Sequence, residues 1–328
     1  MRTGLRNITI AAASLALATS ASAAPAKKKQ PPPQPPPPAA APAQLPAANV
    51  DLAYGAFQRG YFLTAFAEAT KNAQKDDPAA MTLLGELYAQ GLGVAHNDAK
   101  AAEWYKLAAD HGDRDAMFAL AMFNLQGRAG ARNPDEAARL LAAAAKLGHA
   151  PAAYDLGLLY LQGQQFPQDF ARAAELFKQA AGAGNPEAQY ALATMYKEGR
   201  GVPKDINEAM RLMGLASVAG NLDAMVEYAI GEFNGEGVEK NEAGAAILFL
   251  AAARRGSAIA QDRLSRIYMA GRGLPADPTE AVKWHIIAKA SGASDPELDL
   301  FVSQQRKDVR EAAEKAAKKW LSTATPRS

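Results

Sequence analysis

Residues 80–115 read AMTLLGELYAQGLGVAHNDAKAAEWYKLAADHGDRD, and this pattern decides the fold because it returns every 36 residues as far as Asp295. Six copies follow one another without insertion or deletion. Five columns are identical in all six copies, and they start at Ala80, Gly91, Ala101, Ala108 and Gly112. A fixed period of roughly 20–50 residues indicates a solenoid, a propeller or another array of repeated units.

The spacing inside one copy favours helices. Two apolar stripes recur at intervals of three and four residues, and few β-branched residues interrupt them. The stripes consist of Ala80, Leu84, Leu87 and Tyr88, and of Ala101, Trp104, Tyr105 and Ala108. Gly91 ends the first helix and Gly112 the second, because glycine accepts the positive φ of a helix C-terminus. The sequence of each copy therefore predicts a repeat unit made of helix A, a loop, helix B and a tight turn. Each unit must stack on its neighbours to bury its apolar faces.

The alanine columns have an explanation in packing. Small side chains at Ala80, Ala101 and Ala108 let neighbouring helices approach closely. A larger side chain there is expected to overpack the contact, at a cost of about 1–3 kcal/mol. Two columns of large apolar residues, which start at Leu84 and Trp104, complete the predicted core.

The segments that flank the six copies differ from them. Residues 50–79 predict a shortened helix pair, with Gly60 as the break between its helices. Asp295-Pro296-Glu297 predicts a helix start, because proline suits the first turn. A more polar helix within residues 296–328 is typical of a solenoid cap, and we expect Trp320 or Phe301 to cover the last repeat. Its basic residues also fit a contact for acidic surfaces, although a solvated cap face explains them more simply.

The first 23 residues have the pattern of a secretory signal peptide. Arg2 and Arg6 precede an apolar run over residues 8–18, and small residues then lead to a predicted cleavage point between Ala23 and Ala24. An amphipathic N-terminus is the alternative interpretation. The apolar run is too short to cross a bilayer as a helix. We therefore expect an exported protein with no integral membrane span, periplasmic if the source is a bacterium.

Residues 24–49 hold ten of the 20 prolines of the chain. Proline fixes φ and removes backbone donors, so this segment favours an extended polyproline II conformation without a packed core. An inert linker is one interpretation, and a spacer or a ligand for proline-binding grooves is the other.

The composition excludes several classes of function. The chain has 328 residues with 36 Lys and Arg, 34 Asp and Glu, and no cysteine. Without cysteine there are no disulfides, no thiolate metal sites and no cysteine nucleophile. A formal net charge of +2 gives no support for binding nucleic acid. Residues 50–300 hold 24 Lys and Arg against 31 Asp and Glu, so the repeat region itself is acidic.

The repeat resembles a known family. The motif A-x-x-x-L-G-x-x-Y-x-x-G-x-G-V, followed by K-A-x-x-W-Y-x-x-A-A-x-x-G, is similar to the Sel-1-like repeat of the tetratricopeptide-like clan. This chain matches it from Ala80 to Val94 and from Lys100 to Gly112, and the resemblance covers residues 50–295. Asn124 and Glu232 replace its tyrosine, and Gln164-Gln165-Phe166 replaces one G-x-G-V. These departures affect the register of single loops and leave the predicted fold unchanged.

The resemblance implies an all-α fold, namely a right-handed α/α superhelical solenoid of helix-pair repeats with a C-terminal capping helix. The A helices line its concave face, where proteins of the clan hold peptides. When the clan geometry is placed on this chain, the candidate residues for binding a partner are Phe118, Met122, Leu125, Tyr154, Leu158, Leu161, Tyr190, Lys197, Ile230, Phe233, Arg266 and Met269. The alternative interpretation is that these side chains belong to the core.

The motifs of catalysis and metal binding are missing from the sequence. The four histidines form no H-E-x-x-H motif and are interpreted as solvent-exposed structural residues. The G-x-G pieces follow predicted helices and lack the remaining residues of a phosphate loop. No serine begins an S-x-x-K motif. We therefore expect no catalytic, cofactor-binding or metal-binding residues.

These observations predict a non-enzymatic periplasmic scaffold or adaptor that binds a protein or peptide partner. The resemblance implies a role in envelope assembly or signalling. The alternative is a periplasmic negative regulator of a membrane sensor or an exopolysaccharide pathway. A hydrolase acting on cell-wall or β-lactam substrates fits the sequence less well.

Overall fold

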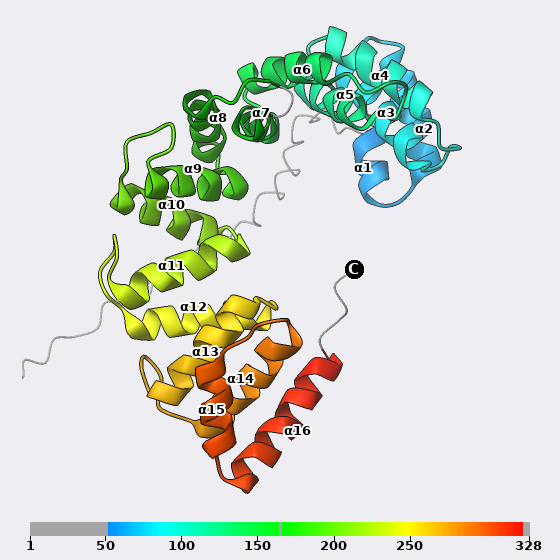
Figure 1. The fold of residues 1–328 in the computed structure, drawn as a ribbon. Coiled ribbons are helices and arrows are strands. Elements are labelled where there is room, and N and C mark those ends of the chain that lie inside the picture. Colours follow the sequence, from blue (N-terminus) through cyan, green and yellow to red (C-terminus); the bar gives the residue numbers. More distant parts are fainter. Residues whose placement is uncertain (1–51, 164–165, 324–328) are drawn as a thin grey trace, which may run out of the picture. The chain divides into compact units, whose positions relative to one another are not determined.

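A computed structural model of the chain describes residues 52–163 and 166–323, which form sixteen α-helices and no strand. Consecutive helices lie side by side in chain order (Figure 1). The predicted signal peptide, its cleavage point and the proline-rich segment lie outside the described residues, as do Gln164 and Gln165. Within the described ranges, no helix is both long enough and apolar enough to cross a membrane.

Each repeat forms one A helix and one B helix, and each of these helices has 13 residues. The A helices are α3 (Pro78–Gln90), α5 (Arg114–Gln126), α7 (Ala150–Gln162), α9 (Pro186–Glu198), α11 (Leu222–Asn234) and α13 (Ala258–Ala270). The B helices are α4 (Asp98–Asp110), α6 (Pro134–Lys146), α8 (Phe170–Gly182), α10 (Ile206–Val218), α12 (Glu242–Arg254) and α14 (Pro278–Ala290). Each helix packs against the helix before it and the helix after it, as the predicted solenoid requires.

Local sequence sets the ends of these helices. All twelve begin after a residue whose side chain accepts a hydrogen bond from a backbone N–H of the first turn, as Asp113 does from Ala116. Each A helix ends at the first glycine column, where φ lies between 66° and 73°. A residue with a side chain would be strained in this left-handed conformation. The sequence of the repeat therefore sets where its helices begin and where each A helix ends.

The alanine columns form the contacts between helices. All eighteen alanines of the columns that start at Ala80, Ala101 and Ala108 are at most 5 % exposed. A neighbouring column also requires small residues: a Cβ atom on Gly157 would lie 2.6 Å from the ring of Phe177. The burial of the alanines agrees with the expected explanation by close packing, since protein interiors leave little space for added atoms.

Two helices precede the six repeats, and two more follow them. α1 (Leu52–Gln58) and α2 (Phe62–Ala73) lie on either side of Gly60. The predicted single capping helix is a pair, α15 (Pro296–Gln304) and α16 (Lys307–Thr323). Gln305 between them is extended, with φ −75° and ψ 150°, which lets α16 fold back onto α14. The ring of Trp320 packs edge-on against Trp284 at 5.9 Å, so Trp320 covers the last repeat as the sequence predicts.

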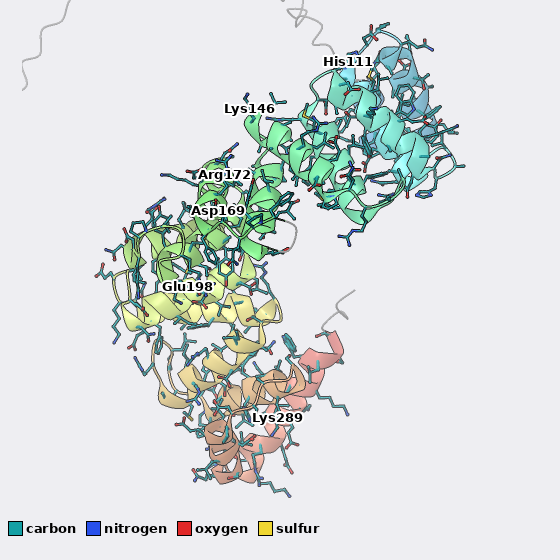
Figure 2. All side chains as sticks on the ribbon, turned by 45° about the horizontal axis from the view of Figure 1, so that its top comes forward. His111, Lys146, Asp169, Arg172, Glu198 and Lys289 are labelled. Carbon is teal, nitrogen blue, oxygen red and sulfur yellow. The ribbon has the colours of Figure 1, made fainter. Side chains whose placement is uncertain are left out.

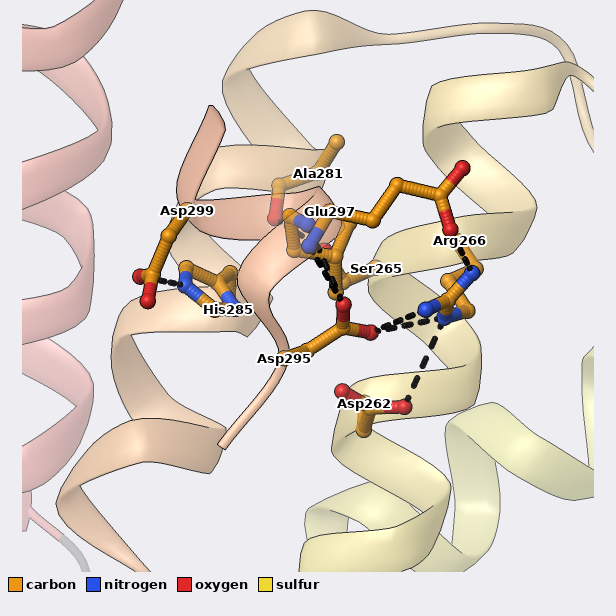
Figure 3. A network of polar contacts seen from close by, with 9 residues as sticks. Asp262, Ser265, Arg266, Ala281, His285, Asp295, Glu297 and Asp299 are labelled. Carbon is orange, nitrogen blue, oxygen red and sulfur yellow. Dashed lines mark hydrogen bonds and ion pairs between the residues drawn. The ribbon is translucent and has the colours of Figure 1, made fainter. Parts of the chain in front are cut away.

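An ion network joins the cap to the sixth repeat (Figure 3). Arg266 of α13 lies 2.5 Å from the carboxylate of Asp295 and 2.6 Å from that of Glu297. Asp295 also accepts the backbone N–H groups of Glu297 and Leu298 and so begins α15. Burial alone raises the pKa of Asp295, but the Leu298 N–H and Arg266 outweigh it and hold that pKa below its usual value. One carboxylate therefore caps a helix and fixes the cap on the solenoid.

The interpretation of all histidines as solvent-exposed is wrong for two of them. The side chain of His285 is 5 % exposed, and its Nε2 lies 2.8 Å from Asp299 of α15. The sequence alone did not show that the cap would cover this face of α14. His149 begins α7, where its Nδ1 accepts the N–H of Ala152, and its side chain is 11 % exposed. Both histidines have structural roles, but in buried or half-buried places.

Candidate functional site

The A helices leave one face uncovered by the B helices. We call it the A-helix face, and it comprises the columns of α3, α5, α7, α9, α11 and α13 whose members are mostly partly or fully exposed. These columns start at Ala79, Thr82, Leu83, Glu86, Ala89 and Gln90. They follow helical spacing, so they form one stripe along each helix. The B helices instead direct charged side chains such as Lys146, Arg172 and Lys289 into solvent (Figure 2).

All twelve predicted partner-binding residues lie on the A helices, and all are partly exposed. Seven of them line two hollows, and the other five line neither. Ile230, Phe233, Arg266 and Met269 line one hollow, and Tyr154, Leu161 and Tyr190 line the other. Phe118, Met122, Leu125 and Leu158 pack against the cores around α5–α8. Ile230 and Phe233 of the first hollow likewise pack against the core around α11–α14. Lys197 pairs with Glu227 at 2.7 Å. The structure thus divides the predicted strip into two separate hollows.

The first hollow lies between α11 and α13 and has a volume of about 350 Å³. We call it the basic pocket, and its lining consists of Ile230, Phe233, Asn234, Phe249, Arg263, Arg266, Ile267, Met269, Ala270 and Arg272. Three arginines and no acidic residue contribute to this lining. Apolar side chains beside a small number of charged groups are the usual composition of a binding pocket.

The three arginines of the basic pocket differ in their partners. Arg266 is held by the acidic residues of the cap network described above. Arg272 pairs with Glu242 at 2.6 Å, and its guanidinium carbon lies 4.3 Å from the ring centre of Phe233. Arg263 is exposed and makes no hydrogen bond or ion pair with any other residue that the structure describes. Arg263 is therefore the cation of this pocket that can receive a partner.

The second hollow extends over α7, α9 and the start of α11 and has a volume of about 370 Å³. We call it the tyrosine pocket, and it is lined by Tyr154, Leu161, Glu187, Tyr190, Ala191, Thr194, Met195, Glu198, Arg200, Asn221 and Asp223. Glu198, labelled in Figure 2, pairs with Arg200 at 2.9 Å. Glu187 and Asp223 make no hydrogen bond or ion pair within the described part of the chain.

Negative charge surrounds the tyrosines of this second hollow. Burial raises the pKa of Tyr154, and the carboxylates of Asp155 and Glu187 raise it further. Burial also raises the pKa of Tyr190, and the negative charges of Glu227 and Asp223 raise that pKa further. Asp155 has no polar partner among the residues described, and burial raises its pKa to about 6. The two hollows therefore differ in charge, although both have apolar walls.

The prediction from sequence missed the residues that give the pockets their charge. Arg263 lies in the column that starts at Leu83, and Glu187 and Asp223 lie in the column that starts at Ala79. The predicted columns start at Glu86, Ala89 and Thr82. Helical spacing could have found the missing ones, because residues seven apart on a helix lie on the same face. Within the described ranges, no group of three or more His, Asp or Glu residues is placed to hold a metal ion.

Comparison with known proteins establishes the family. The model of the Sel1 repeat matches six consecutive segments, namely residues 78–113, 114–149, 150–185, 186–221, 222–257 and 258–292. The chain belongs to the Sel1 repeat family. The predicted resemblance and the predicted all-α solenoid are thereby confirmed. The curated proteins contain no match to this Sel1 repeat chain.

Solved Sel1 repeat structures share the fold. A Sel1 repeat protein from Oxalobacter formigenes is 27 % identical, with a TM-score of 0.62, and the match covers 75 % of this chain and all of that one. The protein c5321, a protective antigen of uropathogenic Escherichia coli with the same fold, is 23 % identical with a TM-score of 0.54. That match covers 84 % of this chain and 68 % of the other. The second likeness concerns the fold alone.

Proposed function

We propose that this Sel1 repeat chain is a non-enzymatic scaffold that binds an extended segment of a partner protein along its A-helix face. The observation that supports this proposal most strongly is the pair of hollows on that one face. Both hollows have apolar walls at the surface and charged groups without a partner among the described residues. Exposed apolar surface of this kind is typical of sites where proteins bind one another.

The repeat architecture supports an extended ligand. Successive A helices present equivalent positions, and a peptide that crosses them contacts one repeat after another. α11 borders both hollows, since Asp223 at its start lines the tyrosine pocket and Phe233 near its end lines the basic pocket. Met side chains such as that of Met269 adapt to apolar residues of different shape. One segment that passes over α11 therefore has anchoring sites on both sides.

The proposed place of action is the periplasm, where the scaffold would serve envelope assembly or signalling. The support is the signal-peptide pattern of residues 1–23. The test is fractionation of the source cells followed by N-terminal sequencing of the protein. We expect the periplasmic form to begin at Ala24. A protein that remains in the cytoplasm with its first residues intact would remove this part of the proposal.

The binding proposal is tested by capture of partners on the purified chain. We expect the variant Met269→Glu to lose the captured protein, because it places a charge in the apolar wall of the basic pocket and Met269 does not belong to a core cluster. The matched control is Val218→Glu on the B helix α10, where the side chain is 92 % exposed. Far-ultraviolet circular dichroism checks that both variants stay helical. Equal capture by wild type and the pocket variant would show that this face is not the binding surface.

Substitutions at Met122 and Leu158 suit this test less well. Both residues were predicted to point into the groove, and both pack against the cores between α5 and α10. A charge at either position is expected to destabilise the fold as well as the surface. Loss of binding in such variants could therefore not be assigned to the A-helix face.

A further inference from the structure

The basic pocket holds one arginine without a polar partner. Arg266 is fixed by the acidic residues of the cap, and Arg272 by Glu242 and the ring of Phe233. Arg263 lies on the same helix as Arg266, one turn before it, and has no polar contact to another residue in the described part of the chain. Its five N–H donors therefore face solvent beside an apolar wall. This arrangement is suited to a carboxylate, because a guanidinium forms two parallel hydrogen bonds with it.

The apolar part of the pocket is suited to one large side chain. Ile230, Phe233 and Met269 are partly exposed around the hollow, and buried Phe249 and Ile267 form its base. A volume of about 350 Å³ is at the small end of the range for binding pockets. It accommodates a single aliphatic or aromatic side chain, with room for a short acidic one at the edge.

The contrast between the two hollows gives the pocket its selectivity. Three arginines and no carboxylate line the basic pocket, whereas three carboxylates and one arginine line the tyrosine pocket. A segment that lies across α11 thus passes from a negative to a positive surface. Complementary charge fixes register and excludes partners with the opposite pattern. An acidic residue on the partner is favoured at the basic pocket and disfavoured at the other.

We propose that the basic pocket binds a polypeptide segment in which an acidic residue stands next to a large apolar residue. The apolar side chain fills the space between Ile230, Phe233 and Met269, and the carboxylate pairs with Arg263. This inference rests on the proposed function of the A-helix face and adds the chemistry of the partner to it. Arg266 and Arg272 contribute to the walls of the pocket. They do not bind the carboxylate of the partner, because each is already paired with an acidic residue of this chain.

The test uses a random library of 12-residue peptides displayed on phage and selected against the full chain. We expect the selected peptides to share an Asp or Glu beside Leu, Phe, Ile or Met. Synthetic peptides from the selection are then measured by fluorescence anisotropy. Arg263→Glu should weaken their binding on the order of tenfold or more, because a charge-assisted hydrogen bond becomes a repulsion. Arg263→Lys should retain part of the affinity.

The matched control is Arg254→Glu, which reverses an exposed arginine at the end of the B helix α12. We expect it to bind the selected peptides as wild type does. A second selection against Arg263→Glu should replace the acidic residue by Lys or Arg beside the same apolar residue. Arg263 has no polar partner among the described residues, so its substitution is expected to leave folding intact, which circular dichroism verifies.

Two negative outcomes have separate meanings. Peptides that depend on Met269 but bind wild type and Arg263→Glu equally would overturn the charge preference and leave the proposed function standing. Peptides that bind the variant Met269→Glu as well as wild type would show that they do not use the basic pocket, and the inference would fall at its premise.

Discussion

Single positions of this repeat change their role from copy to copy. In the column that starts at Leu83, the leucine itself is 8 % exposed and belongs to the core. Two repeats later the same position holds Asp155, and in the last repeat it holds exposed Arg263. The fold fixes the backbone at each copy and the helix geometry fixes the direction of the side chain. The chemistry of the surface can therefore vary while the architecture stays constant.

The raised pKa of Asp155 predicts how the free energy of unfolding depends on pH. Burial raises its pKa to about 6, while an unfolded aspartate titrates at about 3.9. Between these values the folded chain binds the extra proton, so the contribution of Asp155 to the free energy of unfolding falls as the pH rises from about 4 to 6. Asp155→Asn should remove this loss and stabilise the chain at pH 7 by about 1–2 kcal/mol, after allowance for screening at a half-buried site.

Urea unfolding of wild type and Asp155→Asn at pH 4 and pH 7 measures this effect. The difference between the two proteins isolates Asp155 from the other carboxylates that titrate in the same range. We expect the gain in stability at pH 7 to be largely absent at pH 4. An equal difference at both values would show that Asp155 has an ordinary pKa in the folded chain.

At the scale of the helix, the spacing between neighbours depends on alanine. Ala180 of α8 is fully buried and lies at the contact with α7 and α9. Ala142 of α6 is a helical alanine exposed to solvent. Because leucine and alanine both favour helices, the two sites differ mainly in packing. They form a matched pair for testing the role of the alanine columns.

We predict that Ala180→Leu lowers the free energy of unfolding by about 1–3 kcal/mol, since the added atoms overpack a filled contact. Ala142→Leu should change it by less than about 0.5 kcal/mol, as is usual for a surface substitution. Urea unfolding monitored by circular dichroism compares both with wild type. Equal losses of stability at the two sites would mean that the alanine columns do not control the spacing between helices.

At the scale of the whole chain, each helix from α1 to α14 contacts its neighbours in sequence, and α16 of the cap packs on α14 of the last repeat. Such a chain has a stability that is the sum of its units and of the interfaces between them. Trp320 is partly buried against Trp284, and Arg266 ties α13 to the start of α15. Damage to the cap should therefore loosen the sixth repeat first and leave distant repeats unchanged.

We predict that Trp320→Ala destabilises the C-terminal end by about 2 kcal/mol, somewhat less than for a fully buried tryptophan. Hydrogen exchange with mass spectrometry should show faster exchange in α14 and α16 and no change in α4 and α6. The opening is local because the contacts of the cap reach only its neighbours. Faster exchange along the whole chain would contradict this picture of a linear array.

The sequence predicted most of the architecture because the repeat constrains it six times. Ala108, Gly112 and their equivalents set the helix contacts and turns without help from distant residues. The break at Gln305 was not predictable, since neither glycine nor proline marks it and its cause is the packing of α16 on α14. The burial of His285 was missed for the same reason. Both depend on contacts that appear only once the chain folds back.

The candidate site was predicted only in part. Phe233, Met269 and Tyr190 were placed on the A-helix face by their column alone, and they line its two hollows. Sequence columns could not show that Met122 and Leu158 pack against neighbouring core residues, because that depends on the side chains around each copy. The lack of a partner for Arg263 depends likewise on where the acidic residues of the cap come to lie.

Site-specific photo-crosslinking in intact source cells determines whether the A-helix face binds a partner protein. A photoreactive amino acid replaces Met269 in the basic pocket of one variant and Val218 on the B helix α10 of another. Crosslinked products are identified by mass spectrometry. We expect the variant at Met269 to crosslink a distinct partner protein and the variant at Val218 not to do so. The same products from both positions, or from Val218 alone, would contradict a binding surface on the A-helix face.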